Sequence, residues 1–143
     1  MPNEANAAPD PQHTAAFRHT LRVYWEDTDA GGVVFYANYL KFFERARTEW
    51  LRHLGVGQQA LRDATGALFV VTDTRLRYRA PARLDDMLDV TVTLRQRGAA
   101  SMTIAQQAWR GATLLAEGEI RIGCVDQATF RPRRIPNEVT TLL

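Results

Sequence analysis

Two aspartates flank a single residue, shortly before a pair of glycines. The segment reads Asp27-Thr28-Asp29-Ala30-Gly31-Gly32 and precedes the strongest helical pattern in the chain. The N-terminus of a helix has unpaired N–H groups and a partial positive charge. A carbonyl oxygen held there is polarised as it becomes an oxyanion, and a carboxylate beside it attacks the carbonyl or activates a water. The placement of Asp29 therefore suits acyl transfer.

The same spacing also has a purely structural interpretation. Aspartate is common in turns and at helix N-caps, where its carboxylate accepts backbone N–H groups. Asp27 or Asp29 would then only cap the helix or its turn. Residues two apart share a face in a strand, but they need not do so in a turn. Spacing alone favours the structural interpretation, because Asp-x-Asp before glycine is common in loops.

A strand and a long helix flank this motif. Leu21, Val23 and Trp25 alternate with polar neighbours, which predicts a strand over 17–26. From 36 to 54, apolar residues recur three and four positions apart, which predicts a helix with one apolar face. That face consists of Tyr39, Phe43, Ala46, Trp50 and Leu54.

Residue types mark the helix ends and predict a second helix. Gly55 suits the left-handed position that ends many helices. His53 lies in the last turn, where the helix dipole favours a cation. A short helix is expected over 58–64, closed by Gly66.

The remainder of the chain alternates between apolar and polar residues and predicts four more strands. They are expected at about 67–79, 87–97, 102–110 and 114–125, joined largely by short turns. A long helix followed by consecutive hairpin-linked strands indicates an antiparallel sheet and an α+β fold. A single curved sheet wrapped around the helix would bury the apolar face.

Composition indicates one soluble domain. The chain has 143 residues, and domains commonly span ~100–200. Cys124 is the only cysteine, so an internal disulfide is excluded and a cysteine-based zinc site is disfavoured. No apolar run approaches the ~18 residues that cross a bilayer. The first residues lack the parts of a signal peptide, so we expect a cytoplasmic protein.

The sequence also predicts the domain limits, and its charge balance is nearly neutral. We expect a flexible tail at 1–16, a folded domain at 17–133 and a C-terminal extension at 134–143. Basic residues number 18 and acidic residues 16, and Lys41 is the only lysine. A net charge of +2 is too small to indicate nucleic-acid binding without a concentrated patch. The arginine excess is read mainly as compositional bias.

Three segments resemble a known family. The stretch RVYWEDTDAGGVVFYANY, from Arg22 to Tyr39, resembles the signature of the 4-hydroxybenzoyl-CoA thioesterase family. FERARTEWLR (43–52) and YRAPARLDD (78–86) are similar to its Tol–Pal-associated acyl-CoA thioesterase branch, the YbgC-like proteins. The resemblance extends from about Leu21 to Arg133.

The resemblance implies a hotdog fold and hydrolysis of acyl-CoA thioesters without a metal or bound cofactor. It assigns Asp29 as nucleophile or general base. It places the oxyanion donor at the backbone N–H of Tyr36, seven residues later. Many members of the branch have His at the Tyr36 position and Tyr at the Trp25 position, so the acyl preference is open. Any residue except proline supplies the N–H.

Substrate contacts are expected at seven further positions, which are Gly32, Val33, Asn38, Val71, Thr72, Arg97 and Ser101. Asn38 has two interpretations, as a cap or as part of the pocket lining. Arg97 and Ser101 flank a hairpin turn, where they contact CoA phosphates or are simply solvated. The segment from about Phe69 to Thr72, which includes Val71 and Thr72, is expected to approach Asp29 of a second subunit.

Other chemical groups have simpler interpretations. Glu44 is expected to form a structural ion pair with Arg47 or Arg45, although its position recurs in the family. Cys124 reads as a buried small hydrophobe. No metal-ligand spacing is present. A hotdog dehydratase is disfavoured because no His lies near Asp29 or on the early helical turns.

The remaining expectations concern partners. Outward-facing apolar residues in the strands would need cover, so we expect a homodimer or homotetramer with the site at the subunit interface. The branch is associated with acyl carrier protein and with the Tol–Pal system. A partner-binding module with little hydrolysis is therefore the alternative to an acyl-CoA thioesterase.

Overall fold

The computed structural model describes residues 17–143, and the tail expected at 1–16 lies outside this range. The described chain contains one long helix, short helices and five strands. In order, the elements are β1 (Phe17–Arg22), the 3-10 turn η2 (Trp25–Asp27), α2 (Asn38–His53), α3 (Gln58–Thr65), β2 (Ala67–Tyr78), β3 (Met87–Arg97), β4 (Ser101–Arg110), β5 (Thr113–Asp126) and α4 (Asn137–Thr140).

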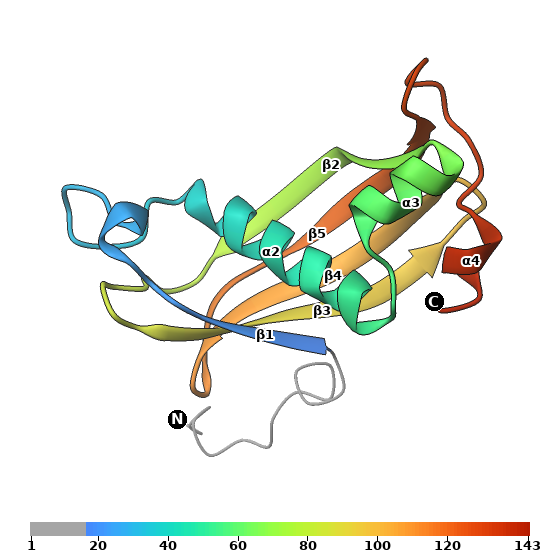
Figure 1. Cartoon of the computed structure of the whole chain (residues 1–143). Coiled ribbons are helices and arrows are strands. Elements are labelled where there is room, and N and C mark those ends of the chain that lie inside the picture. The colour runs from blue at the N-terminus through green and yellow to red at the C-terminus, as the bar shows by residue number, and fades with distance from the viewer. Residues whose placement is uncertain (1–16) are drawn as a thin grey trace.

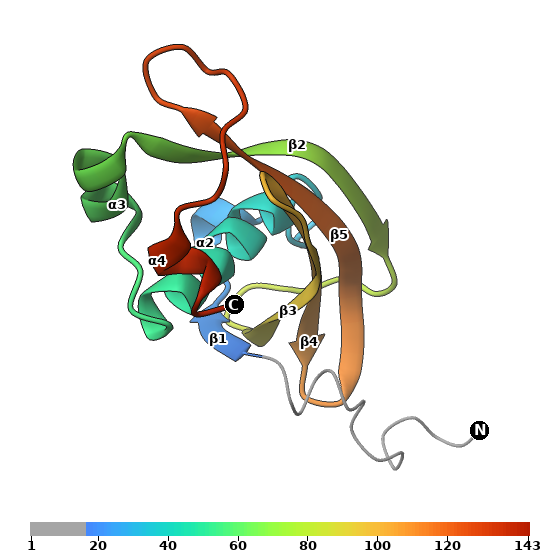
Figure 2. The ribbon, with the colours of Figure 1, turned by 90° about the vertical axis from the view of Figure 1, so that its right-hand side faces the viewer.

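The strands form a single antiparallel sheet in the order β1-β3-β4-β5-β2. Figure 1 shows α2 lying across one face of this sheet, and Figure 2 shows the strands curving around it. The expected α+β architecture, an antiparallel sheet wrapped around one long helix, is confirmed.

The strand order corrects the expectation that the last four strands follow one another as hairpins. β3–β4 and β4–β5 are hairpin neighbours, but β2 pairs with β5 and lies at the opposite edge of the sheet from β1. The connection from β2 to β3 pairs instead with the segment before α2, where the Val34 N–H donates to the Ala82 carbonyl at 2.8 Å. An isolated bridge joins Val33 to Arg83. These long-range contacts have no local sequence signal.

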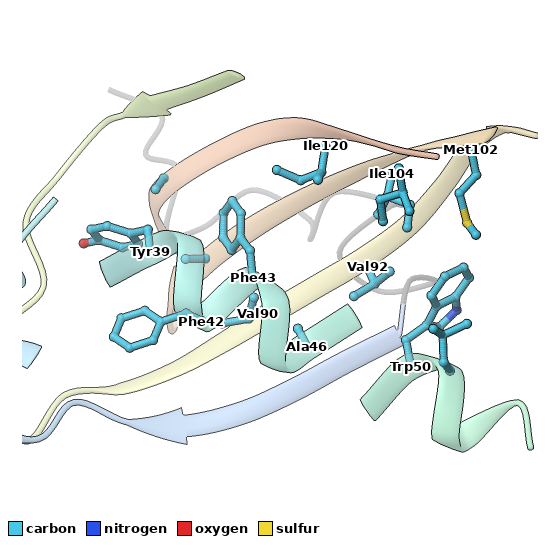
Figure 3. Packing of buried hydrophobic residues seen from close by; sticks show 14 of the residues in the cluster. Tyr39, Phe42, Phe43, Ala46, Trp50, Val90, Val92, Met102, Ile104 and Ile120 are labelled. Carbon is cyan, nitrogen blue, oxygen red and sulfur yellow. The ribbon is translucent and has the colours of Figure 1, made fainter. Parts of the chain in front are cut away.

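The core lies between α2 and the sheet. Side chains of α2 face those of the strands, as Figure 3 shows. The buried helix residues are Tyr39, Phe42, Phe43, Ala46, Trp50 and Leu51. Phe42 and Leu51 were not in the predicted stripe, and Leu54 is only half-buried. The curved sheet covers a wider arc of the helix than a flat one would.

The long helix begins later than the sequence pattern predicts. Tyr36 lies in a turn before Asn38, the first helical residue. In that turn the Phe35 carbonyl accepts the Asn38 N–H at 2.8 Å. The expectation that Tyr36 opens the helix is therefore wrong. The pattern failed here because tyrosine occurs in both states and the turn bond is not visible in periodicity.

The C-terminal end of α2 follows the prediction closely. Gly55 has φ +97° and its N–H donates to the Arg52 carbonyl. The Val56 N–H donates to the Leu51 carbonyl at 2.7 Å. This pair of bonds is the Schellman motif, which satisfies carbonyls that the helix leaves unpaired. Gly66, with φ +78°, ends α3 with a single bond from its N–H to the Arg62 carbonyl at 2.8 Å.

The first strand is shorter than expected. β1 ends at Arg22, and Trp25 lies in η2 with its side chain 80% exposed. The Asp27 N–H donates to the Tyr24 carbonyl, and the Asp27 carboxylate accepts the Tyr24 N–H. This pair of bonds turns the chain before the alternation is complete, so the prediction of a strand to residue 26 is wrong.

The outer face of the sheet is polar. Arg75 and Arg77 of β2 lie on this face beside glutamates of β5, and Arg79 follows directly after β2. Arg79 pairs with Glu117 at 2.6 Å. Val71, Tyr78 and Met87 of the strands are nonetheless exposed, so the expectation that outward apolar residues need cover stays a prediction.

The C-terminal residues 134–143 pack against the rest of the domain. Ile135 and Val139 are buried, and the Ile135 N–H donates to the Ala99 carbonyl at 2.8 Å. Figure 1 places α4 near the end of α2 that is farthest from the Asp29 loop. No helix described within residues 17–143 is long and apolar enough to cross a membrane.

Candidate active site

Asp29 lies in a tight loop that folds back on itself. Its N–H donates to the Val33 carbonyl at 2.8 Å, and Thr28 and Val34 form an antiparallel bridge. Its carboxylate Oδ1 accepts the N–H groups of Gly31 at 2.8 Å and Val33 at 3.4 Å. The bonds on Oδ1 fix the orientation of the carboxylate. Among residues 17–143, no donor contacts Oδ2.

Asp27 has a different environment from Asp29. It is 6% exposed, and its carboxylate is used to hold η2. Its carbonyl accepts the Phe35 N–H and the Asn38 side-chain amide, both at 2.9 Å. The two aspartates of the motif thus do not share a face. Asp27 ties the loop to the start of α2, while Asp29 is exposed.

An open depression adjoins Asp29. Asp29 and Gly32 both contribute to its lining, so the structure brings together these two predicted residues. The rest of its lining consists of Trp25, Glu26, Thr28, Ala30 and Leu84. Sequence reasoning did not assign Trp25 or Leu84 to the site. An exposed tryptophan next to the motif was the available signal for Trp25, whereas Leu84 arrives through a long-range contact.

Gly32 and Val33 shape the loop. Gly32 has φ +81°, a conformation that glycine adopts without strain. A side chain added at Gly31 would lie 3.2 Å from the Asp29 Oδ1 atom. Glycine at 31 therefore lets the backbone approach the carboxylate closely. Val33 is half-buried, and its backbone is engaged with Asp29 and Arg83.

Tyr36 lies on the helix side of the same loop. Its N–H has no acceptor within the described part of the chain, and its carbonyl accepts the Tyr78 hydroxyl at 3.0 Å. The two rings meet edge to face with centroids 6.2 Å apart. Burial, followed by repulsion from Tyr36, raises the pKa of the Tyr78 phenol. Tyr78, which sequence reasoning missed, thus positions the Tyr36 backbone.

Asn38 has a structural partner in this chain. Its side-chain amide donates to the Asp27 carbonyl and so joins α2 to the Asp27 turn. The remaining predicted contacts lie elsewhere. Val71 and Thr72 are in the first half of β2, beside a β-bulge, and they do not line the Asp29 depression. Val71 is 50% exposed, and the Thr72 hydroxyl donates to the Arg121 carbonyl.

Arg97 and Ser101 flank the β3–β4 turn, as predicted. The Gly98 N–H donates to the Ser101 carbonyl at 2.8 Å, which closes the turn. The Ala99 carbonyl in the same turn accepts the Ile135 N–H, so this hairpin turn lies on the same side of the domain as α4 (Figure 1). Within one chain, Arg97 and Ser101 are therefore not brought to Asp29.

A second, more enclosed cavity of about 160 Å³ lies between α2 and the sheet. Glu44, Arg47 and Val71 are among its lining residues. Glu44 accepts the Thr48 hydroxyl at 2.7 Å, and the expected ion pair with Arg45 or Arg47 does not form within 4 Å. Burial lowers the pKa of the Arg47 guanidinium, and the charge of Glu44 partly opposes that shift.

Other chemical groups carry no site in the described part of the chain. Cys124 is buried, as predicted, and burial raises the pKa of its thiol. Its sulfur lies 3.8 Å from the Arg134 carbonyl. No group of three or more His, Cys, Asp or Glu residues suited to a metal ion occurs between 17 and 143.

Comparisons with known proteins place this geometry in a family. The family model of the thioesterase-like superfamily matches residues 23–143 of this chain. The chain belongs to that superfamily. It is 45% identical over 128 residues to the acyl-CoA thioester hydrolase YbgC of Escherichia coli O6:H1, covering 89% of this chain and 95% of that protein. The acyl-CoA thioesterase YbgC of Haemophilus influenzae is 42% identical, with 86% and 90% covered.

A solved structure agrees with the sequence relatives. A probable thioesterase from Bartonella henselae superposes with a TM-score of 0.79 at 31% identity, covering 83% of this chain and 98% of that one. These comparisons confirm three predictions at the level of the family. They are the hotdog fold, membership of the YbgC-like branch and the activity of a thioester hydrolase. The comparisons carry no role for any individual residue.

Proposed function

We propose that this protein hydrolyses acyl-CoA thioesters to a free acid and CoA, with Asp29 as the reacting carboxylate. Oδ2 of Asp29 attacks the thioester carbonyl and expels the CoA thiolate, and water then hydrolyses the mixed anhydride. In the alternative route Asp29 takes a proton from a water that attacks directly. In both routes the N–H of Tyr36 stabilises the oxyanion.

One observation supports this assignment above all. Asp29 is held by two backbone N–H groups on Oδ1, while Oδ2 and the Tyr36 N–H have no partner among the described residues. A tight loop that fixes one carboxylate oxygen and leaves the other open is suited to reaction. Asp27, two residues earlier, is buried and committed to the turn, so it does not compete for this role.

The test is thiol release from a panel of acyl-CoAs by the wild type and by Asp29→Asn. We expect kcat/KM to fall ~10²–10⁴-fold, the usual effect of losing a positioned acid–base group. Asp126→Asn is the matched control, since Asp126 also accepts backbone N–H groups but pairs with the start of β2, opposite the Tyr78 end that contacts Tyr36. Equal turnover by wild type and Asp29→Asn would refute the role of Asp29.

We further propose that the working unit is a homodimer or homotetramer. β2 is a twelve-residue strand at the sheet edge, and among the described elements it pairs only with β5. An unpaired edge of that length is a template for pairing with another chain. Pairing there would bring Val71 and Thr72 of one subunit towards the site of the other. Sedimentation as a 16.1 kDa monomer at micromolar concentration would contradict this.

Subunit mixing tests whether the site is shared. Asp29→Asn and Val71→Arg should each have low activity alone, because one lacks the carboxylate and the other blocks the expected acyl contact. Mixed subunits contain one intact combination and should regain activity. A mixture no more active than its components, in a preparation where mixed dimers are shown to form, would argue that each chain has a complete site.

Binding of acyl carrier protein is the second candidate function. An acidic partner needs a face with an excess of arginine, but the arginines of β2 lie beside glutamates of β5. Arg75 and Arg79 form ion pairs with Glu119 and Glu117. This mixed charge favours hydrolysis over docking as the main activity. Capture of acyl carrier protein by Asp29→Asn, with negligible acyl-CoA turnover by wild type, would reverse the order.

A further inference from the structure

The cavity between α2 and β2 has walls of two kinds. Its apolar walls come from the sheet and the helix, and its polar residues come mainly from α2. Phe69, Val70 and Val71 of β2 are among the apolar residues, with Trp50 of α2. The volume of about 160 Å³ is close to the ~150 Å³ cavity that admits benzene. The space therefore suits a group of about six carbon atoms.

Arg47 is the cation of this cavity. It is half-buried, and its Nη1 donates to the Gln106 side-chain oxygen at 2.9 Å. Gln106 is fully buried and donates in turn to the Phe43 carbonyl at 3.0 Å. Gln106 thus anchors the guanidinium to the core. Such an anchored side chain loses little freedom when it binds a ligand.

No carboxylate of the described chain neutralises Arg47 directly. None of the ion pairs between residues 17 and 143 includes it. Glu44 also lines the cavity, but it is exposed and its Oε2 is engaged by the Thr48 hydroxyl. Water screens an exposed charge more strongly than a half-buried one. The cavity therefore presents a guanidinium whose remaining N–H donors suit a planar anion.

We propose that Arg47 determines acyl specificity, by binding a carboxylate at the far end of a short acyl group held in this cavity. The guanidinium fork matches a carboxylate in shape and charge, and the apolar walls accommodate the methylene groups between the two ends. The substrate class is the CoA monothioester of a dicarboxylic acid of about six carbons.

This inference rests on the proposed function. The cavity is lined by Phe69, Val70 and Val71, the part of β2 that we expect to face the partner subunit's catalytic loop. Asp29 would then attack the thioester end while Arg47 of the other chain binds the far end. The chemistry is the same hydrolysis, and Arg47 contributes binding rather than bond cleavage.

The experiment compares two substrates of equal length, hexanoyl-CoA and adipoyl-CoA, which end in a methyl group and a carboxylate. Wild type should have the higher kcat/KM for adipoyl-CoA. Arg47→Met should reduce kcat/KM for adipoyl-CoA roughly 10- to 100-fold, the scale of a hydrogen bond to a charged group. It should leave hexanoyl-CoA within about threefold, because the methyl end makes no such bond.

Three variants separate recognition from structure. Arg45→Met, an exposed site on the same helix, should leave the ratio of the two substrates unchanged. Arg47→Lys keeps the charge and should restore part of the adipoyl preference. Glu44→Gln removes the opposing charge and should raise that preference. Thermal unfolding reports any loss of the Gln106 anchor. Such a loss would lower kcat/KM equally for both substrates, and that outcome would contradict the proposal.

Product binding gives an outcome that does not depend on catalysis. Titration calorimetry should show adipate binding to wild type more tightly than hexanoate, and Arg47→Met should abolish the difference. Hydrolysis of acyl-CoAs with no preference for adipoyl-CoA would overturn the role of Arg47 while leaving the proposed function intact. Selective adipate binding without hydrolysis would uphold the Arg47 site and refute the proposed function. Absence of both would refute both.

Discussion

The two ends of α2 are built differently. At the C-terminal end, Gly55 and Val56 donate their N–H groups to the last carbonyls, and Val56 is buried. At the N-terminal end, Ala37 is the N-cap and provides no side-chain cap bond. The Tyr36 N–H has no acceptor in the described chain, and Trp25 and Tyr36 expose large rings.

This contrast has a physical meaning. Backbone groups at helix ends are normally satisfied, because an unpaired polar group costs free energy. One end of α2 satisfies them locally and adds apolar cover. The other end keeps an N–H and an Asp29 oxygen open beside exposed aromatic surface. Functional sites are where proteins depart from the rules that favour stability. Variants at the two ends should therefore respond differently, in activity at one end and in stability at the other.

Removing the open N–H should reduce activity without removing stability. Tyr36→Pro lacks the donor, and we expect kcat to fall ~10²–10³-fold, the effect of losing one oxyanion donor. Tyr36→Phe keeps the N–H and should stay close to wild type. Rates of thiol release and thermal unfolding should be measured together. A Tyr36→Pro protein that folds and retains wild-type kcat would show that this N–H is not used.

A change near the C-terminal end of α2 should instead reduce stability and leave activity unchanged. Ile135→Ala removes a side chain that is only 3% exposed, and we expect a loss of about 2–5 kcal/mol in the free energy of unfolding. The turnover of the fraction that remains folded should be unchanged, because Ile135 bonds to the β3–β4 turn and precedes α4, which lies away from the loop before α2 (Figure 1). Urea unfolding measures the first quantity and thiol release the second. A loss below about 0.5 kcal/mol would mean that residues 134–143 are not part of the core.

The Schellman turn gives a smaller effect of the same kind. Gly55→Ala places a side chain at φ +97°, which costs about 1–2 kcal/mol. Gly55→Asn should be less destabilising, since asparagine tolerates the left-handed region better. Chemical unfolding of the three proteins should follow the order Gly, Asn, Ala. Equal stability of the two variants would show that backbone strain is not the cause.

Asp126 provides the smallest effect, and it depends on pH. Hydrogen bonds from the Thr129 and Ala128 N–H groups lower the pKa of its carboxyl. The folded pKa thus lies below the unfolded value of about 3.9, so the stabilisation is present above that value and is lost as pH falls through the folded pKa. The difference in melting temperature between wild type and Asp126→Asn should shrink as pH falls below about 3.9. A difference independent of pH would contradict this linkage.

Much of the fold was predictable because it is encoded locally. The stripe of Tyr39, Phe43, Ala46 and Trp50 identified the long helix, and Gly55 marked where it ends. Alternation gave four strands within about one residue of their observed limits, close to the usual uncertainty. The motif around Asp29 was also visible as a sequence of residue types, and the resemblance supplied its chemical interpretation.

Other features depended on contacts between distant residues. The order β1-β3-β4-β5-β2 follows from pairing across the chain. The connection carrying Ala82 and Arg83 pairs with the loop before α2, which brings Leu84 to Asp29. Strand alternation separated two sets of side chains, but a period of two does not reveal which set meets the helix.

The sequence by itself determined the helix, the strands and the presence of an aspartate loop before a helix, since periodicity and turn residues act within a few positions. Only the tertiary structure decided that Asp27 is buried while Asp29 is exposed, that α2 begins after Tyr36, and that Gln106 holds Arg47 at a cavity. Burial and hydrogen bonding depend on which segments meet in space. Segments far apart in the chain meet through the packing of the whole domain, which no local pattern records.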